Sequence, residues 1–131
     1  IGTIHYLLSE FREAIEYYEQ ALKVSREIGG RSGEGSGLRI LGLAYARLGE
    51  TRKAIEYYEQ ALKISREIGD RMGEGNALWN MSLALNEIGN RTQAIERAKS
   101  ALTILESIES PHAEKVKRKL QEWEEASSQI Q

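Results

Sequence analysis

The sequence of 131 residues contains no cysteine, a single proline and no long apolar stretch. Without cysteine the chain can form no disulfide, no thiolate metal site and no cysteine nucleophile. No run approaches the roughly 18 apolar residues of a membrane-spanning helix, and no basic segment followed by an apolar one is typical of a signal peptide. These absences agree with a reducing compartment, so we expect a cytoplasmic protein without a membrane partner.

The chain also lacks an excess of either charge, since 18 basic and 20 acidic residues give a formal net charge of −2. Binding to nucleic acid or to an anionic bilayer is favoured by a basic excess, so we expect no nucleic-acid partner. The two histidines, His5 and His112, are far apart, and we expect no metal site and no cofactor. Because no residues are spaced as a catalytic set, we do not expect an enzyme.

What the sequence has instead is repetition. Residues 10–35 and 50–75 agree at 21 of 26 aligned positions, and a weaker third copy begins at Ala94, again forty residues on. A fixed period of roughly 20–50 residues is typical of units that cannot bury their apolar face alone and stack on their neighbours. We therefore expect function to lie on the surface of the stack.

Within each unit the apolar residues recur at intervals of three and four, which indicates helices. Gly29, Gly49, Gly69 and Gly89 are placed to end helices in the left-handed conformation, and Asp70 and Asn90 to cap the helices that follow. Each unit is thus predicted to be two antiparallel helices joined by a tight turn. The predicted helices are 1–8, 11–28, 31–48, 51–68, 71–88, 91–108 and 111–128.

The last predicted helix differs from the others. Ser110 and Pro111 are a favourable helix start, with serine as the N-cap and proline at the first helical position. A single narrow apolar stripe follows, made of Ala113, Val116, Leu120, Trp123 and Ser127. Such a helix, apolar on one side and charged on the other, is predicted to cap the end of the array.

The pattern Leu38-x-x-Leu41-Gly42-x-x-Tyr45, followed by Ala54, Tyr58 and Ala61, resembles the tetratricopeptide repeat. The forty-residue period exceeds the usual period of about 34, and residues 66–75 are similar to the longer variant in kinesin light chains, cell-polarity adaptors and bacterial signalling proteins. The resemblance implies an all-α, right-handed superhelical solenoid of antiparallel helix hairpins with a C-terminal capping helix. The expected parts are a truncated first repeat (1–30), a second repeat (31–70), a third repeat (71–110) and the capping helix (111–131).

In tetratricopeptide arrays the first helix of each unit lines a concave groove that holds a segment of a partner. By this resemblance Thr3 and Leu7 of the first unit would also face the groove. A simpler interpretation is that Trp79 lies half-buried against a neighbouring helix and that the arginines are only solvated. The residues expected to contact a partner are Arg39, Leu43, Arg47, Asn76, Trp79, Asn80, Leu83 and Asn86.

One class of ligand is disfavoured by the sequence itself. Family members that bind chaperone tails hold a terminal carboxylate with lysine, asparagine and arginine, but the corresponding places here are Ile40, Asn76 and Asn80. We therefore expect an internal segment of a partner rather than a chain terminus.

The sequence thus predicts a non-catalytic protein-interaction scaffold that binds a protein or peptide. Two alternatives remain open: an array that self-associates end to end through exposed apolar residues (Ile1, Ile4, Leu8, Phe11 and Ile15), and a sensory segment of a larger signalling protein. Because the sequence opens within a repeat, with Ile1-Gly2 aligned to Leu41-Gly42, we expect it to be a piece of a longer protein.

Overall fold

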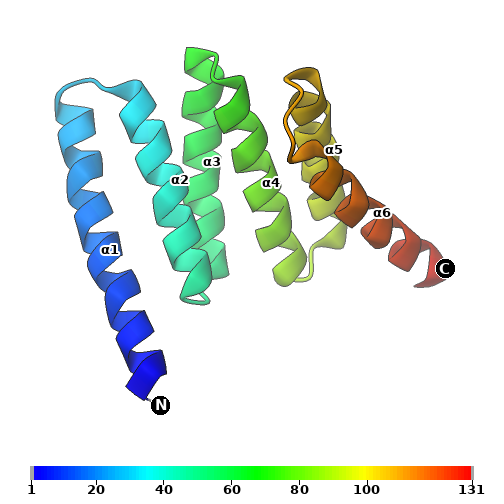
Figure 1. Cartoon of the computed structure of the whole chain (residues 1–131), viewed down its shortest axis with the longest axis horizontal. Helices are drawn as coiled ribbons and strands as arrows, with labels where there is room; N and C mark the ends of the chain where they lie inside the picture. Colours follow the sequence, from blue (N-terminus) through cyan, green and yellow to red (C-terminus); the bar gives the residue numbers. More distant parts are fainter. Residues whose placement is uncertain (1, 131) are drawn as a thin grey trace.

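The computed structural model describes the backbone of residues 2–130 and the side chains of residues 9–128. Over this range the chain forms six α-helices and no strand, so the predicted all-α solenoid of helix hairpins is confirmed. The helices stand side by side in chain order, with the two termini at opposite ends of the row (Figure 1). Their bounds are α1 Gly2–Glu27, α2 Arg31–Arg47, α3 Thr51–Ile68, α4 Arg71–Glu87, α5 Arg91–Ser107 and α6 Ala113–Ile130.

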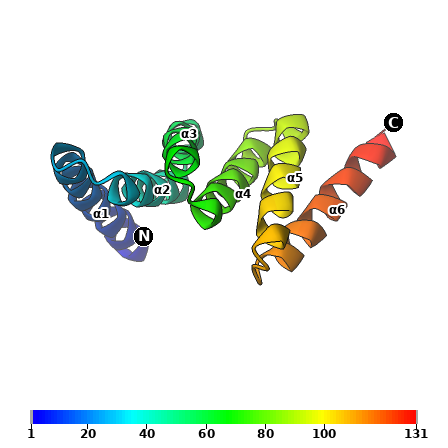
Figure 2. The ribbon, with the colours of Figure 1, turned by 90° about the horizontal axis from the view of Figure 1, so that it is seen from above.

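Contacts in this row are local. Each helix packs on the next one in sequence, and α2 also touches α4. Seen from above, the row runs from α1 at one end to α6 at the other without closing on itself (Figure 2). This is the arrangement of a solenoid, in which each unit contacts only its neighbours and one core runs through the stack.

The glycines predicted to end helices in the left-handed conformation do so. Gly29, Gly49, Gly69 and Gly89 have φ angles of 72°, 84°, 73° and 87°, a region that costs a side chain with a Cβ roughly 1–2 kcal/mol. Glu109 occupies the equivalent turn between α5 and α6 with a φ of 55°. The side chain of Asp70 accepts a hydrogen bond from Gly73 N at 2.9 Å, and that of Asn90 accepts one from Gln93 N at 3.2 Å. Both predicted N-caps are confirmed.

The prediction of separate helices at 1–8 and 11–28 is wrong, because α1 is one continuous helix from Gly2 to Glu27. Where the later units have Gly49 and Gly89, the first has Ser9, which adopts a left-handed turn only at a cost. No proline follows to force one, and the helix continues. The expected roles of Thr3, Ile4, His5, Leu7 and Leu8 concern side chains outside the described range, and Ile1 lies outside it altogether.

The capping helix starts two residues later than predicted, at Ala113 rather than Pro111. Pro111 and His112 form a turn, in which the backbone N–H of His112 donates to the Ser110 hydroxyl at 3.2 Å. Glu109 has the positive φ that glycine adopts at the equivalent place in the other turns, and Pro111 is compatible with the end of α5 because it cannot continue a helix. The predicted stripe is confirmed, since Val116, Leu120 and Trp123 are buried.

A close approach between α2 and α3 explains the glycine in the repeat motif. A Cβ at Gly42 would stand 2.5 Å from Cε1 and 2.7 Å from Cδ1 of Tyr58, the ring that fills this part of the core. In the third unit the same two places are held by Ser82 and Ala98, both fully buried. The serine fits because the ring that would oppose it is absent.

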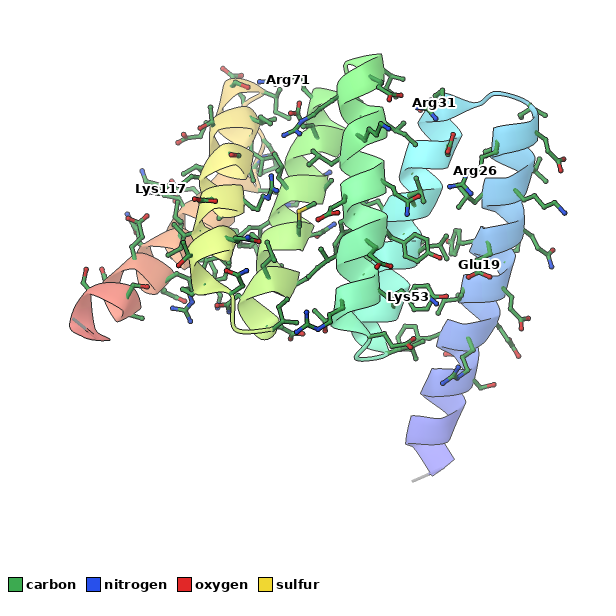
Figure 3. The ribbon with its side chains drawn as sticks, turned by 180° about the vertical axis from the view of Figure 1, so that it is seen from behind. Glu19, Arg26, Arg31, Lys53, Arg71 and Lys117 are labelled. Carbon is green, nitrogen blue, oxygen red and sulfur yellow. The ribbon has the colours of Figure 1, made fainter. Side chains whose placement is uncertain are left out.

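Arginine–glutamate pairs join each hairpin to the next, and Figure 3 shows Arg26 and Arg31 on either side of the α1–α2 turn. Glu34 accepts from Arg26 and from Arg31, each at 3.0 Å. The same arrangement recurs one unit on, where Arg66 donates to Glu74 at 3.0 Å. We call the pairs Arg26–Glu34 and Arg66–Glu74 the inter-unit clamps.

The inter-unit clamps have no counterpart at the end of the array. Glu106 of α5 occupies the place of Arg66, and no ion pair of the described residues joins α5 to α6. The capping helix is therefore held to α5 without an ion pair among the described residues, whereas the earlier units are joined by packing and ion pairs together.

Candidate functional site

A hollow of about 490 Å³ lies over α2, α4 and α6. The first helices of the second and third units, α2 and α4, thus line one hollow together with the capping helix α6. Among the residues that line the hollow are Leu43 and Arg47 from α2, Asn80, Leu83 and Asn86 from α4, and Lys119 from α6.

A second hollow of about 350 Å³ adjoins the first, between α4 and α6. Leu83 and Lys119 line both, so the two hollows form one surface, which we call the groove. Leu83 on α4 is 37% exposed, so the groove contains a large apolar side chain that solvent can reach. The remaining residues of the second hollow are Trp79, Lys115, Arg118 and Glu122.

Trp79 combines the two roles that the sequence left open. Its ring is half-buried and stacks on Trp123 of α6, with centroids 6.1 Å apart and planes at 29°. Its remaining surface borders the second hollow. Trp79 therefore anchors the capping helix as well as lining the groove, so its removal would disturb the position of α6.

The capping helix is held by a further polar link near the same place. The guanidinium of Arg91 lies 5.8 Å from the centre of the Trp123 ring, a distance at which a cation is attracted to the ring face. Its Nε donates to Oδ1 of Asn86 at 2.6 Å. The amide of Asn86 is thus partly committed to structure and offers a partner only its remaining groups.

The eight predicted residues do not form one cluster. Arg39 and Asn76 line a separate hollow of about 120 Å³ between α2 and the start of α4, together with Asp70 and Gly73. Arg39 and Arg47 both act on the Tyr58 hydroxyl and favour its charged form, but burial dominates and raises the pKa of Tyr58 to about 12. Neither arginine belongs to an ion pair of the described residues.

The sequence prediction missed the contribution of α6. The sequence predicts only that one side of the capping helix is charged, yet four residues of that side line the groove: Lys115, Arg118, Lys119 and Glu122. Their spacing of three and four residues does place them on one face. The sequence could not indicate that this face turns toward α4, because that depends on how Trp79 and Trp123 meet.

Within the described part of the chain, no group of three or more histidine, aspartate or glutamate side chains is placed to hold a metal ion. None of the described helices is long and apolar enough to cross a membrane.

Comparison with protein families gives one match. The model of a tetratricopeptide repeat matches residues 1–67 and 34–107. A comparison with curated proteins gives no match.

Several solved structures share the fold. The apo form of RapI superposes with a TM-score of 0.86 at 19% identity, covering 98% of this chain and 47% of that one. BtubC (BKLC) from P. vanneervenii gives 0.82 at 24% identity, with coverage of 90% and 49%. A signal transduction ATPase with numerous domains from Pyrococcus horikoshii, which has a tetratricopeptide repeat sensor, gives 0.68 at 26% identity, with coverage of 72% and 15%. The chain spans less than half the length of each.

Proposed function

The chain belongs to the tetratricopeptide repeat family, and from this we propose that it is a non-catalytic, cytoplasmic interaction module whose groove binds a segment of a partner protein. Helical repeats of this kind generally serve as protein-interaction or sensor modules and carry no catalytic machinery. The observation that carries the proposal is the exposed Leu83 in the groove, next to the partly exposed Trp79 and to Arg47, which forms no ion pair with the described residues.

These side chains are of the kinds that dominate binding energy. Tryptophan and arginine are enriched at the centres of interfaces, where truncating one residue costs about 2 kcal/mol or more. Arginine also holds carboxylates with paired hydrogen bonds. The groove joins these groups on the surface that the first helices share, which supports a peptide-binding role.

The test is selection of peptides from a random library by the immobilised chain, followed by affinity measurement on two variants. Leu83→Glu places a charge in the groove, and Ile68→Glu places the same charge on α3 outside both hollows. The two side chains are 37% and 43% exposed, so the control is matched. We expect Leu83→Glu to weaken the selected peptides by about 1–3 kcal/mol and Ile68→Glu to leave them unchanged. Absence of any selected peptide, or equal binding by both variants, would refute the groove assignment.

Trp79→Ala is a poorer test of the groove than Leu83→Glu. Because Trp79 stacks on Trp123, its truncation would loosen α6 and lower binding for two reasons at once. Arg39→Glu changes a side chain in the neighbouring hollow rather than in the groove. With Arg39→Glu, peptides held in the groove should lose less affinity than with Leu83→Glu.

A second candidate function is sensing within a larger signalling protein. It is favoured by the similarity to the signal transduction ATPase that has a tetratricopeptide repeat sensor. In this case a ligand in the groove would change the activity of an attached domain. The full-length parent, assayed with and without a selected peptide and with Leu83→Glu, distinguishes sensing from passive recruitment.

Self-association is a third candidate, favoured by an exposed apolar face on α1. It is not the face predicted from the sequence, because Ile15 is buried in the core and Phe11 is half-buried. Tyr17, Val24 and Ile28 are 69%, 53% and 76% exposed and lie on one side of the helix. In the second unit the equivalents of Tyr17 and Val24 are covered, since Tyr57 stacks on Tyr45 with ring centroids 5.3 Å apart and Ile64 is buried. A homo-oligomer would be supported if the mass in solution rises with protein concentration and if Val24→Glu returns that mass to the monomer value. A strict monomer would exclude it.

A further inference from the structure

We propose that the groove selects acidic segments, in which carboxylate side chains flank a central apolar one. This inference rests on the proposed function, because it names the chemistry of the segment that the groove holds. The observation behind it is the sign of the charge around Leu83.

The groove is basic although the whole chain is not. Four basic side chains line its two hollows, namely Arg47, Lys115, Arg118 and Lys119, against two acidic ones, Glu87 and Glu122. The formal net charge of the whole chain is −2. The excess of positive charge is therefore a local property of this surface, and the acidic residues that outweigh it lie elsewhere.

The two acidic side chains do not cancel this charge. Glu122 lies 3.5 Å from Lys119 on the same helix, and Glu87 accepts a bond from Thr51 at 3.4 Å. No ion pair of the described residues includes Arg47, Lys115 or Arg118. Three cations thus line the groove without an acidic partner among residues 9–128, and a ligand carboxylate would supply one.

The exposed apolar side chain of the groove, Leu83, lies between these cations. Leu83 shares the first hollow with Arg47 and the second with Lys115 and Arg118, while Lys119 borders both. An apolar side chain placed on Leu83 would thus have positive charge on either side. An extended peptide advances about 3.3–3.6 Å per residue, so carboxylates within about two residues of the apolar one reach both groups. A protein segment fits this mixture better than a nucleic acid, which presents phosphates without an aliphatic side chain.

The inference is tested with synthetic peptides of about 12 residues, long enough to cross the groove when extended. The first peptide has a central leucine flanked on each side by aspartate and glutamate. The second replaces every carboxylate by its amide, the third replaces the carboxylates by lysine, and the fourth replaces the leucine by glycine. Affinities are measured by fluorescence anisotropy at low salt and at about 1 M salt, where the screening length falls to about 3 Å.

We expect the acidic peptide to bind the chain at least about tenfold more tightly than the amide peptide, and we expect high salt to remove that difference in affinity. Removing the leucine should also weaken binding. In the double variant Arg47→Glu/Lys119→Glu the order should reverse, with the lysine peptide binding tighter than the acidic one. The matched control is Lys63→Glu/Lys99→Glu, which changes the net charge equally at exposed positions outside both hollows. It should keep the original order.

Failure of the inference and failure of the proposed function give different results. If selected peptides depend on Leu83 but bind equally well as acid and amide, the groove function stands and the acidic preference is wrong. If both double variants shift binding alike, the effect comes from net charge and the assignment to the groove is wrong. A single-stranded DNA oligonucleotide that competes as well as the acidic peptide would overturn the choice of a protein ligand.

Discussion

The contact between Gly42 and Tyr58 permits a test of packing in which helix propensity cancels. Gly42→Ala and Gly37→Ala both replace a glycine inside α2, so each gains about 0.8–1.0 kcal/mol of helix propensity. At Gly37 the new Cβ would meet only Cδ1 of Leu22, at an ordinary 3.9 Å. At Gly42 it would stand 2.5 Å from a ring atom of Tyr58, which is 2% exposed and enclosed by the core.

The difference between the two variants therefore measures overpacking alone. Forcing an extra methyl group into a packed core costs about 1–3 kcal/mol, so Gly42→Ala should be less stable than Gly37→Ala by about that amount. Urea unfolding followed by far-UV circular dichroism gives both free energies of unfolding. Equal stability of the two variants would refute the argument.

A double-mutant cycle identifies Tyr58 as the cause. Tyr58→Ala leaves a cavity and should cost about 3–5 kcal/mol by itself. In that background the methyl group at position 42 meets no ring, so Gly42→Ala should become stabilising by about 0.8–1.0 kcal/mol. A penalty that persists without Tyr58 would place the obstruction elsewhere. The third unit already combines Ser82 with Ala98, as this reasoning requires.

Three further predictions follow from the helix ends and the buried ionisable groups. Amide exchange should be faster in residues 31–40 than in 71–80, because α2 begins at Gly30 without a side-chain cap. Gly30→Asp should reduce this difference in exchange rate and stabilise the chain by about 0.4–1 kcal/mol. Faster exchange in residues 71–80 would contradict the prediction. Hydrogen bonds from Arg26 and Arg31 hold the pKa of Glu34 below its usual value, so the stabilisation of the fold by Glu34 should be present above about pH 4.3 and lost as the pH falls through the lower folded pKa. The decrease in the free energy of unfolding caused by Glu34→Gln, measured in urea, should therefore become smaller at acidic pH. A decrease independent of pH would refute this. Burial raises the pKa of Tyr58 to about 12, so ultraviolet titration should contain a tyrosine component near that pH which Tyr58→Phe removes.

Much of the fold could be predicted because the same pattern of apolar residues and turn glycines occurs in three successive units. The left-handed glycines and the caps at Asp70 and Asn90 are local chemistry that the sequence reveals directly. The errors fall where the repeat loses a residue with a fixed conformational role. Ser9 lacks the freedom of Gly49, and the helix runs on through the expected turn.

The groove was harder to predict than the fold. Leu43, Arg47, Asn80 and Leu83 could be placed because they share a face of α2 or α4 with the repeat motif. The roles of Trp79, Asn86 and the basic side chains of α6 depend on the docking of a helix that follows no repeat. Its position is set by the stack of Trp79 on Trp123 and by the guanidinium of Arg91 over the Trp123 ring. Neither contact can be predicted from a single sequence.

The inter-unit clamps also determine how the array would respond to mechanical load. Arg26–Glu34 joins α1 to α2 and Arg66–Glu74 joins α3 to α4, so two junctions between units carry a clamp, whereas α5 and α6 share no such ion pair among the described residues. A force pulling the two termini apart would therefore peel the capping helix away first. Since that helix forms one wall of the groove, tension on the chain would release a bound segment before any hairpin came apart.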